Sequence, residues 1–312
     1  MCDIVSIIYG INEDGDAGEA LFLIPYIESG NVAEGRRLAS VAMTEDIGIK
    51  SYSGYFTVNK TYNSNQFFWY FPAINKPIRS ACQYPVVLWL QGGPGASSLF
   101  GLLNENGPIT LAYNTIEKRQ FHWALLSHLI YIDNPVGAGF SFTDDPHGYS
   151  TDQVQIGEEL YSSVIQFLQL FPELQTNKFY ITGESYAGKY IPALAYTIHK
   201  KNPDAKIKVN LKGAAIGNGL CDPVNQIGVY GEYLRQLGLI DVNEEKVFEE
   251  YQNKTIDYIK QEKWKEALDT FNELILGEYS IFGQFVNWPK ILYSPNIVFL
   301  ANRIFILLQL YA

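Results

Sequence analysis

The segment that most constrains how this chain folds runs from Lys178 to Pro192. It starts with aromatic and β-branched residues, which favour a buried strand, and apolar residues then recur at helical spacing from Ile191 to Ile198. Ser185 stands between the two parts, with Gly183 before it and Ala187 after it. A serine in a tight turn from strand to helix is the arrangement of a nucleophile elbow, whose usual pattern is G-x-S-x-G.

The small residues around Ser185 have a physical reason. The backbone of an elbow serine is strained, and the helix that follows must pack close to the strand. The turn places the Ser185 hydroxyl at the N-terminus of a helix, where the backbone N–H of Tyr186 can help to hold an oxyanion. The alternative is an ordinary strand–loop–helix junction in which the serine caps the helix. The motif alone leaves that alternative open, and two loops upstream argue against it.

Both of these loops are rich in glycine and follow predicted buried strands. One runs from Gln91 to Ser98 after the apolar strand 86–90, and the other runs from Asp133 to Ser141 after the strand 129–132. The carboxyl ends of parallel strands meet at the ligand crevice of an open sheet. Plain turn chemistry would explain one such loop, but three in a row after three strands favour a single site.

Strands and helices alternate along the first two thirds of the chain, which predicts an α/β fold with a mostly parallel sheet and helices on both faces. A hairpin is expected near the start, with its turn at 59–65. The helix expected over 150–171 has a plausible capping box formed by Ser150 and Gln153. The predicted strands are 52–58, 66–71, 86–90, 129–132, the run through Tyr180, and 211–216.

After Asp222 the sequence becomes polar and acidic, with patterns typical of helices. We therefore predict a core over residues 1–224 and a helical cap insertion over 225–284, with helices at 242–251 and 258–276. Residues 285–312 form an apolar tail of unknown role. Its final run of hydrophobic residues is shorter than the ~20 residues that cross a bilayer, so no membrane span is expected.

The net charge and the cysteine spacing exclude some classes of binding partner and cofactor. The net charge of −10 without a basic cluster argues against binding to nucleic acid or anionic lipid. The three cysteines, Cys2, Cys82 and Cys221, lie far apart and lack metal-ligand spacing. We expect neither a metal nor another cofactor.

With these motifs in view, the chain resembles the serine carboxypeptidases of the α/β-hydrolase fold. It is most similar to the vitellogenic-like members, over residues from about 19 to about 284. The resemblance implies that Ser185 is the nucleophile and that the N–H groups of Gly93 and Tyr186 form the oxyanion hole. It also implies that four residues bind the C-terminal carboxylate of a peptide or protein substrate: Gln91, Gly92, Glu105 and Glu184.

The chemistry of the two acids fits that role. Paired carboxylates raise each other's pKa, so that one of them stays neutral and donates a hydrogen bond to the substrate's carboxylate. Such a pair favours acidic conditions, as in a lysosome or vacuole. Without the resemblance, two solvated loop acids would be the preferred interpretation of Glu105 and Glu184.

The residues offer no general base for the serine. His122, His128 and His147 precede Ser185, whereas in α/β-hydrolases the acid and the histidine follow the serine. His199 lies on the elbow helix about 21 Å away, at ~1.5 Å per residue. We expect the Asp and His of a triad to lie in a C-terminal part that this chain lacks, and the chain itself to turn over little. Two alternatives stay open: a non-catalytic protein that binds peptide C-termini, and an acyltransferase on the same fold.

Asn59 and Asn253 each begin an N-glycosylation sequon. With the resemblance they predict a glycoprotein of the secretory pathway, lysosomal, vacuolar or extracellular. The apolar N-terminal run at 4–11 is short and lacks a basic flank, so it does not resemble a signal peptide.

Overall fold

The computed structural model describes residues 19–75, 84–112, 115–276 and 280–286. The chain divides into two compact units, residues 1–219 and residues 220–312. Within the described ranges, no helix has both the length and the apolar character needed to cross a membrane. The apolar tail predicted from the sequence lies outside the described residues from position 287 onward.

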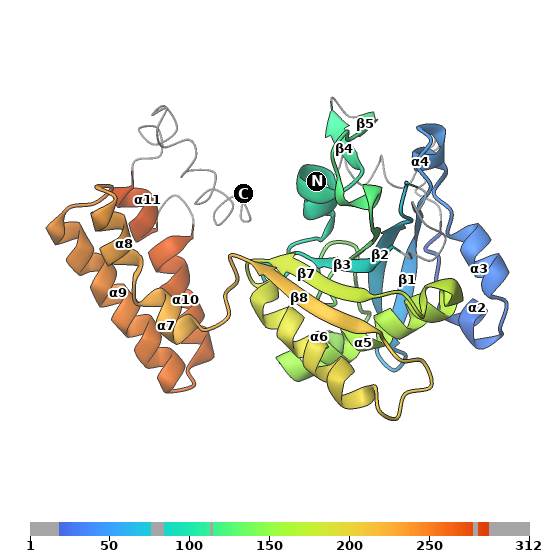
Figure 1. Ribbon diagram of the computed structural model, residues 1–312. Coiled ribbons are helices and arrows are strands. Elements are labelled where there is room, and N and C mark those ends of the chain that lie inside the picture. Colours follow the sequence, from blue (N-terminus) through green and yellow to red (C-terminus); the bar gives the residue numbers. More distant parts are fainter. Residues whose placement is uncertain (1–18, 76–83, 113–114, 277–279, 287–312) are drawn as a thin grey trace. The chain divides into compact units, whose positions relative to one another are not determined.

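The first unit is built on a six-stranded sheet with the strand order β1-β2-β6-β3-β7-β8. The strand β2 runs antiparallel to both of its neighbours, β1 and β6, whereas β6, β3, β7 and β8 run parallel to one another. The mostly parallel sheet and the N-terminal hairpin are therefore confirmed (Figure 1). The strands are β1 (Tyr52–Asn59), β2 (Ser64–Phe71), β3 (Val86–Leu90), β6 (His128–Ile132), β7 (Phe179–Glu184) and β8 (Leu211–Gly217).

Alternating side chains divide the core of this unit between the two faces of the sheet. On one face, Phe68 and Leu88 pack with the long helices α5 (Gln153–Leu170) and α6 (Ala187–Lys201), which also pack on each other. On the other face, Trp69 packs with residues from the short helices η1 and η2. The central strands are buried on both faces, as continuous apolar runs predict.

Shorter elements surround this sheet. They are α2 (Ile24–Glu28), α3 (Val32–Leu38), α4 (Ala42–Asp46), the π-helix η1 (Gly101–Asn106), the hairpin β4 (Ile109–Ala112) and β5 (Thr115–Lys118), and the 3-10 turns η2 (Trp123–Leu125), η3 (Pro146–Gly148) and η4 (Pro172–Leu174).

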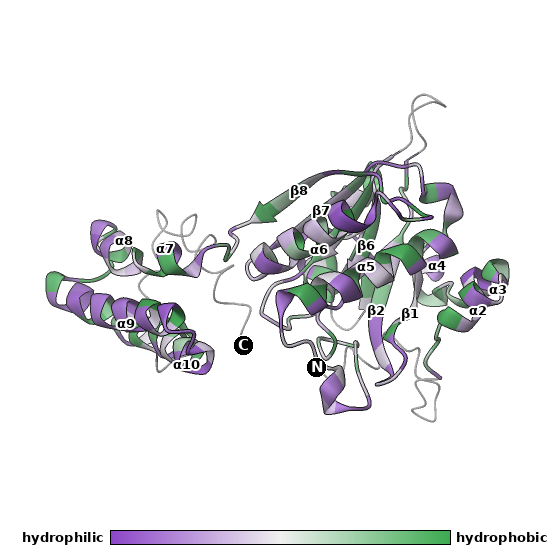
Figure 2. Cartoon of the chain, turned by 90° about the horizontal axis from the view of Figure 1, so that it is seen from below, coloured by the Kyte–Doolittle hydropathy of each residue, from purple (hydrophilic) through white to green (hydrophobic). Residues whose placement is uncertain are grey.

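The second unit is helical over its described residues. It comprises α7 (Pro223–Ile227), α8 (Tyr230–Gln236), α9 (Val242–Lys260), α10 (Trp264–Ile275) and α11 (Ile281–Phe285). Phe248 and Leu274 are fully buried in its core. Figure 2 shows hydrophilic residues along much of α9, interrupted by the apolar ones that face this core.

Two details of the prediction are wrong. The N-cap of α5 is Asp152, whose carboxylate accepts from the N–H of Gln155, whereas Ser150 donates its hydroxyl hydrogen to Glu159. The predicted break at 252–257 is absent because α9 continues to Lys260. The reason for the second error is burial: Thr255 is almost fully enclosed and bonds back to the carbonyl of Tyr251, so packing overrides its weak helix propensity.

Candidate active site

Ser185 occupies the turn between β7 and α6, and its backbone confirms the predicted elbow. Its φ is +58°, in the left-handed region that non-glycine residues rarely adopt. The turn is held from both sides, because Ser185 N–H donates to the carbonyl of Gly217 at 2.9 Å and Gly188 N–H donates to the carbonyl of Ser185 at 3.0 Å. A strained residue that its surroundings hold in place is typical of a functional position.

Glycine at 92 allows the loop after β3 to lie directly against this elbow. A Cβ added to Gly92 would lie 2.5 Å from the nitrogen of Tyr186 and 2.7 Å from Cβ of Ser185. The next residue, Gly93, has φ +114°, which also favours glycine. The loop backbone and the N-terminal N–H of α6 therefore lie beside Ser185, the arrangement that an oxyanion hole requires.

A chain of hydrogen bonds runs from the sheet to the two acids. Trp89 Nε1 donates to Gln91 Oε1 at 2.9 Å, and Gln91 Nε2 donates to Glu184 Oε1 at 2.7 Å. Gln91 is fully buried and Glu184 nearly so. The side chain of Glu105, from η1, lies within hydrogen-bonding distance of Glu184. The structure thus brings Gln91, Glu184 and Glu105 together.

The electrostatics of this pair favour a proton on Glu105. Burial, followed by the charge of Glu184 and the hydrogen bond to it, raises the pKa of Glu105 to about 8, against a smaller lowering by Arg119. The carboxyl of Glu105 is therefore neutral at neutral pH and donates to Glu184. A neutral acid beside a carboxylate is the arrangement that can accept another carboxylate nearby.

Asp133 ties the two glycine-rich loops together. Its carboxylate accepts from Ser97 Oγ at 2.7 Å and from Ser98 N–H at 2.8 Å in the first loop. In the second loop it accepts from Phe140 N–H at 2.9 Å, and a Cβ on Gly139 would lie 2.1 Å from the same carboxylate. Burial raises the pKa of Asp133 to about 6 despite these donors. Glycine at 139 thus allows the second loop to close on this carboxylate.

The remaining residues considered in the sequence are the histidines and the two sequon asparagines. Among the described residues, no hydrogen bond joins a histidine to Ser185: His128 bonds the Tyr70 hydroxyl, His147 pairs with Asp145, and His199 lies in the last turn of α6. Asn59 ends β1, and Asn253 is exposed on α9 in the second unit.

Three residues of this site are missing from the sequence-based prediction: Trp89, which orients the Gln91 amide, Asp133, and Arg119, which donates to the carbonyl of Leu103 in η1. Trp89 and Asp133 stand inside or next to the loop motifs, so their position carried a usable signal. Nothing in the sequence around Arg119 connects it to Glu105, because the contact depends on how η1 packs.

A family profile described as serine carboxypeptidase matches residues 42–286. The venom serine carboxypeptidase of Apis mellifera is 54% identical over 264 residues, which cover 84% of this chain and 56% of the relative. The vitellogenic carboxypeptidase of Aedes aegypti is 50% identical over 237 residues, covering 76% and 49%. The chain thus spans about half the length of the curated relatives it matches.

Among solved structures, the chain is similar to Kex1Δp, a prohormone-processing carboxypeptidase from Saccharomyces cerevisiae. The TM-score is 0.64 at 26% identity, and the match covers 73% of this chain and 52% of the yeast protein. The sheet order, the elbow and this likeness identify the fold as that of an α/β-hydrolase, as the sequence predicts.

Proposed function

Because this chain belongs to the serine carboxypeptidase family, we propose that it is the part of a serine-type carboxypeptidase that carries the nucleophile and reads the substrate's C-terminus. The observation that carries the proposal is the polar chain Gln91–Glu184–Glu105 beside a strained Ser185. A carboxypeptidase must bind the free carboxylate of its substrate next to the scissile bond, which a pair of acids with one proton can do. An endopeptidase binds no carboxylate there and does not need such a pair.

In this proposal the Ser185 hydroxyl attacks the carbonyl carbon of the last peptide bond. The N–H groups of Gly93 and Tyr186 stabilise the oxyanion that forms, and the released C-terminal residue leaves an acyl-enzyme that water hydrolyses. A general base must take the serine's proton. We assign that base to a residue outside the described ranges, since no described histidine bonds to Ser185.

In this proposal the substrate's carboxylate accepts hydrogen bonds from neutral donors and does not pair with a cation. Neutral Glu105 turns its hydrogen toward the incoming carboxylate, and the Gln91 amide and Gly92 N–H lie beside it. Because burial and the charge of Glu184 raise the pKa of Glu105 to about 8, the site loses this donor as the pH rises through that value. Acidic and neutral conditions therefore both support binding, and alkaline conditions weaken it.

The test measures reaction and recognition separately. A fluorophosphonate probe should label Ser185 in protein that turns over a blocked dipeptide, and Ser185→Ala should remove the label. The same dipeptide acid should bind more tightly than its C-terminal amide. Equal affinity for acid and amide would contradict the assignment of Glu105, Glu184 and Gln91.

One alternative has an observation in its favour. The whole carboxylate-reading chain lies within the described residues, whereas no base for Ser185 does. Selective binding of the acid without labelling or turnover would therefore identify a non-catalytic protein that binds peptide C-termini. Transfer of the acyl group to an alcohol, in place of hydrolysis, would identify an acyltransferase.

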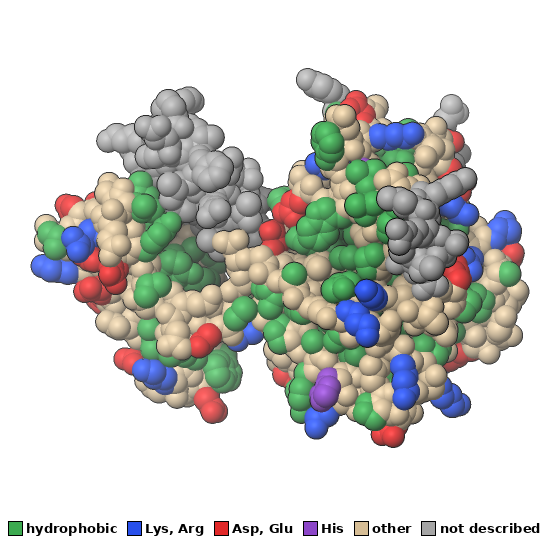
Figure 3. All heavy atoms as spheres, in the orientation of Figure 1, with side chains coloured by type: hydrophobic (Ala, Val, Ile, Leu, Met, Phe, Trp, Pro, Cys, Tyr) green, Lys and Arg blue, Asp and Glu red, His purple; other side chains and the backbone are tan. Residues whose placement is uncertain are grey.

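We also propose that the protein passes through the secretory pathway and carries glycans at Asn59 and Asn253. Asn253 is exposed on α9, and Asn59 lies at the hairpin end of β1. Face-on, charged side chains of both signs are scattered over the surface rather than gathered in a basic patch (Figure 3), which suits a peptide substrate better than nucleic acid. Protein from its native source should migrate faster after glycosidase treatment.

A further inference from the structure

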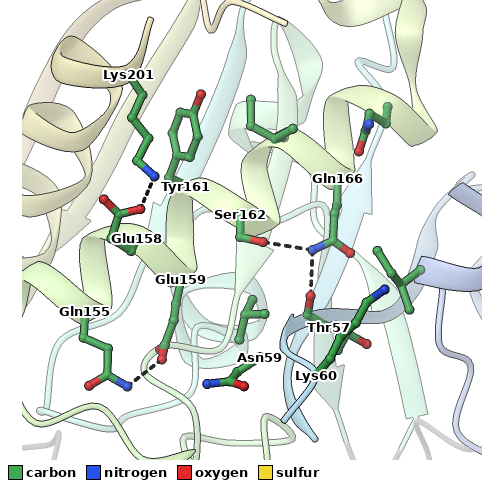
Figure 4. A pocket seen from close by; sticks show the side chains of 14 residues that line it. Thr57, Asn59, Lys60, Gln155, Glu158, Glu159, Tyr161, Ser162, Gln166 and Lys201 are labelled. Atoms are coloured by element: carbon green, nitrogen blue, oxygen red, sulfur yellow. Dashed lines mark hydrogen bonds and ion pairs between the residues drawn. The ribbon is translucent and has the colours of Figure 1, made fainter. Parts of the chain in front are cut away.

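A groove on the first unit, away from Ser185, has no role in the function proposed above. It lies along α5, with the end of β1 on one side and α2 and the end of α6 at its rims (Figure 4). Its volume is about 770 Å³, within the range of ~300–1,000 Å³ that is usual for small-molecule sites. All of the residues that line it belong to one compact unit.

The groove contains an acceptor that is buried without a donor. Gln166 is only 5% exposed, and both hydrogens of its Nε2 are used, toward the carbonyl of Thr57 at 2.9 Å and toward Ser162 Oγ at 3.1 Å. These two bonds fix the orientation of the amide. Its Oε1 then has no hydrogen-bond partner among the described residues. A buried acceptor of this kind takes its hydrogen from a donor outside the chain, either an ordered water or a ligand group that enters the groove.

The charges of the groove exclude an anionic occupant. The two lysines that line it are already paired, Lys60 with Glu28 at 2.5 Å and Lys201 with Glu158. Glu159, which is buried, accepts from Ser150 Oγ and Gln155 Nε2, so it adds a carboxylate without a matching cation. Within the described part of the chain no group of side chains could hold a metal ion. The fitting ligand is neutral and rich in hydroxyl or amide donors.

The lining also offers apolar surface. The ring of Tyr161, with Lys201 Nζ 5.2 Å from its centroid, and the side chains of Ile165 and Val58 stand beside the polar groups. Aromatic and aliphatic surfaces mixed with a few amides and carboxylates suit a sugar ring, which has apolar faces and polar edges.

One lining residue supplies a place for such a ligand to be attached. Asn59 is half-buried and lies between Glu159 and Thr57 in the view of Figure 4. Its Oδ1 accepts from Thr61 N–H at 2.9 Å and Tyr62 N–H at 3.4 Å. Its Nδ2 donates no hydrogen bond within the described ranges, so the nitrogen that a glycan would use is not engaged.

We propose that this groove is the docking site of the first sugar residues of an N-linked glycan carried by Asn59 itself. The proposal rests on the secretory route proposed above. The glycan folds back onto α5, where an amide or hydroxyl hydrogen of a proximal N-acetylglucosamine is donated to Gln166 Oε1, and a sugar face packs on Tyr161. A sequon that looks like an ordinary surface site thus becomes part of the packing between β1 and α5.

The test compares the two sequons in one molecule. The chain is secreted from eukaryotic cells, glycan occupancy is read by mass spectrometry, and release by a peptide-N-glycosidase is followed under native conditions. Because the enzyme needs the glycan out of the groove, release at Asn59 should be about tenfold slower than at exposed Asn253. After denaturation the two rates should be equal, and the denatured chain also serves as reference if Asn253 is unoccupied.

Matched variants separate the glycan from the side chains that hold it. Thr61→Ser keeps the sequon and should keep slow release and protection of α5 from hydrogen exchange, whereas Thr61→Val removes the sequon and should lose that protection. Tyr161→Ala should raise the release rate at Asn59 toward that at Asn253. Tyr196→Ala, which removes a 62% exposed ring from α6, should not.

Several results would overturn the proposal. They are an unoccupied Asn59 in secreted protein, equal native release at both asparagines, or no response to Tyr161→Ala. Binding of free chitobiose to Thr61→Val without slow release in the parent would show a site for an external saccharide instead. None of these readouts depends on peptidase turnover, so failure here and failure of the proposed activity are distinguishable.

Discussion

The loops around Ser185 and the helical unit that follows them differ in how far their residues obey local conformational and electrostatic preferences. Beside the serine, local preferences are violated: Ser185 has φ +58° and Glu105 keeps its proton up to about pH 8. In the helical unit they are mostly obeyed: Asp241 and Glu244 form a complete capping box at the start of α9. The contrast indicates that function is concentrated in the first unit, because strain and buried charge persist only where something selects for them.

The sharpest test of this contrast is to relieve the strain at the serine. In protein that also has the general base, Ser185→Gly should lower turnover by on the order of 10⁶-fold, because an enzyme without its nucleophile keeps only residual catalysis. It should also stabilise the fold by about 1 kcal/mol, since glycine adopts the left-handed region without a steric cost. The measurements are peptide hydrolysis and thermal unfolding.

The matched control lies in the helical unit. Glu262 also has a positive φ, +58°, in the turn after α9. Glu262→Gly should stabilise that unit without touching turnover. If it lowered activity, or if Ser185→Gly destabilised the protein, the link between strain and function would fail.

A second prediction concerns close approach at Gly92. Gly92→Ala forces a Cβ to within 2.5 Å of a backbone nitrogen, so the loop must move. We expect a loss of about 1–3 kcal/mol of stability, as for overpacked cores, together with a clear fall in kcat. Urea unfolding and dipeptide hydrolysis measure the two effects.

Gly228→Ala is its counterpart in the helical unit. The added Cβ there would meet Ile256 Cδ1 at 3.6 Å, an ordinary van der Waals contact, and φ is −64°. Its effect on stability should be neutral or slightly favourable. Similar losses in both variants would mean that Gly92 has no special part in shaping the site.

The third prediction is a pH dependence with a defined sign. A pKa raised to about 8 means that Glu105 is protonated below that value and loses its hydrogen above it. Affinity for a dipeptide acid should therefore be level below pH 8 and fall about tenfold per pH unit above it. The stability that the protonated form contributes should likewise be complete at acidic pH and lost as the pH rises through 8.

Glu105→Gln keeps a hydrogen donor that does not titrate, so its binding should no longer fall above pH 8. Calorimetric titration with the acid and its C-terminal amide at several pH values gives the comparison. An unchanged pH profile in this variant would place the titrating group elsewhere.

The smallest expected effect is at the cap of α9. Asp241→Ala removes the acceptor for the N–H groups of Asn243 and Glu244, so the melting temperature of the helical unit should fall by a few degrees while turnover is unchanged. Those two bonds lower the pKa of Asp241, so its contribution is present at neutral pH and is lost as the pH falls through that lowered value. A loss of activity would contradict the division between the two regions.

Local pattern explains which parts of the fold were predictable. The strands 86–90 and 129–132 are uninterrupted apolar runs, and such runs can be buried only in the middle of a sheet. The elbow at Ser185 was predictable because its small neighbours have no other reason to stand there. The cap of α5 was assigned to Ser150 instead of Asp152, because serine and aspartate both cap helices. In the folded chain the Ser150 hydroxyl instead donates to Glu159, a contact that the local sequence does not indicate.

The sheet, the elbow and the glycine loops were predictable from the residues alone, because they follow from side-chain periodicity and from backbone angles that few residues tolerate. Contacts between side chains that are far apart in the sequence depend on how the elements pack in three dimensions. Glu105 comes to Glu184 through the packing of η1, Arg119 approaches the same pair, and Asn59 shares a groove with Gln166 of α5. Burial and proximity set the proton on Glu105 and the unsatisfied oxygen of Gln166, and neither property belongs to a residue until the chain has folded.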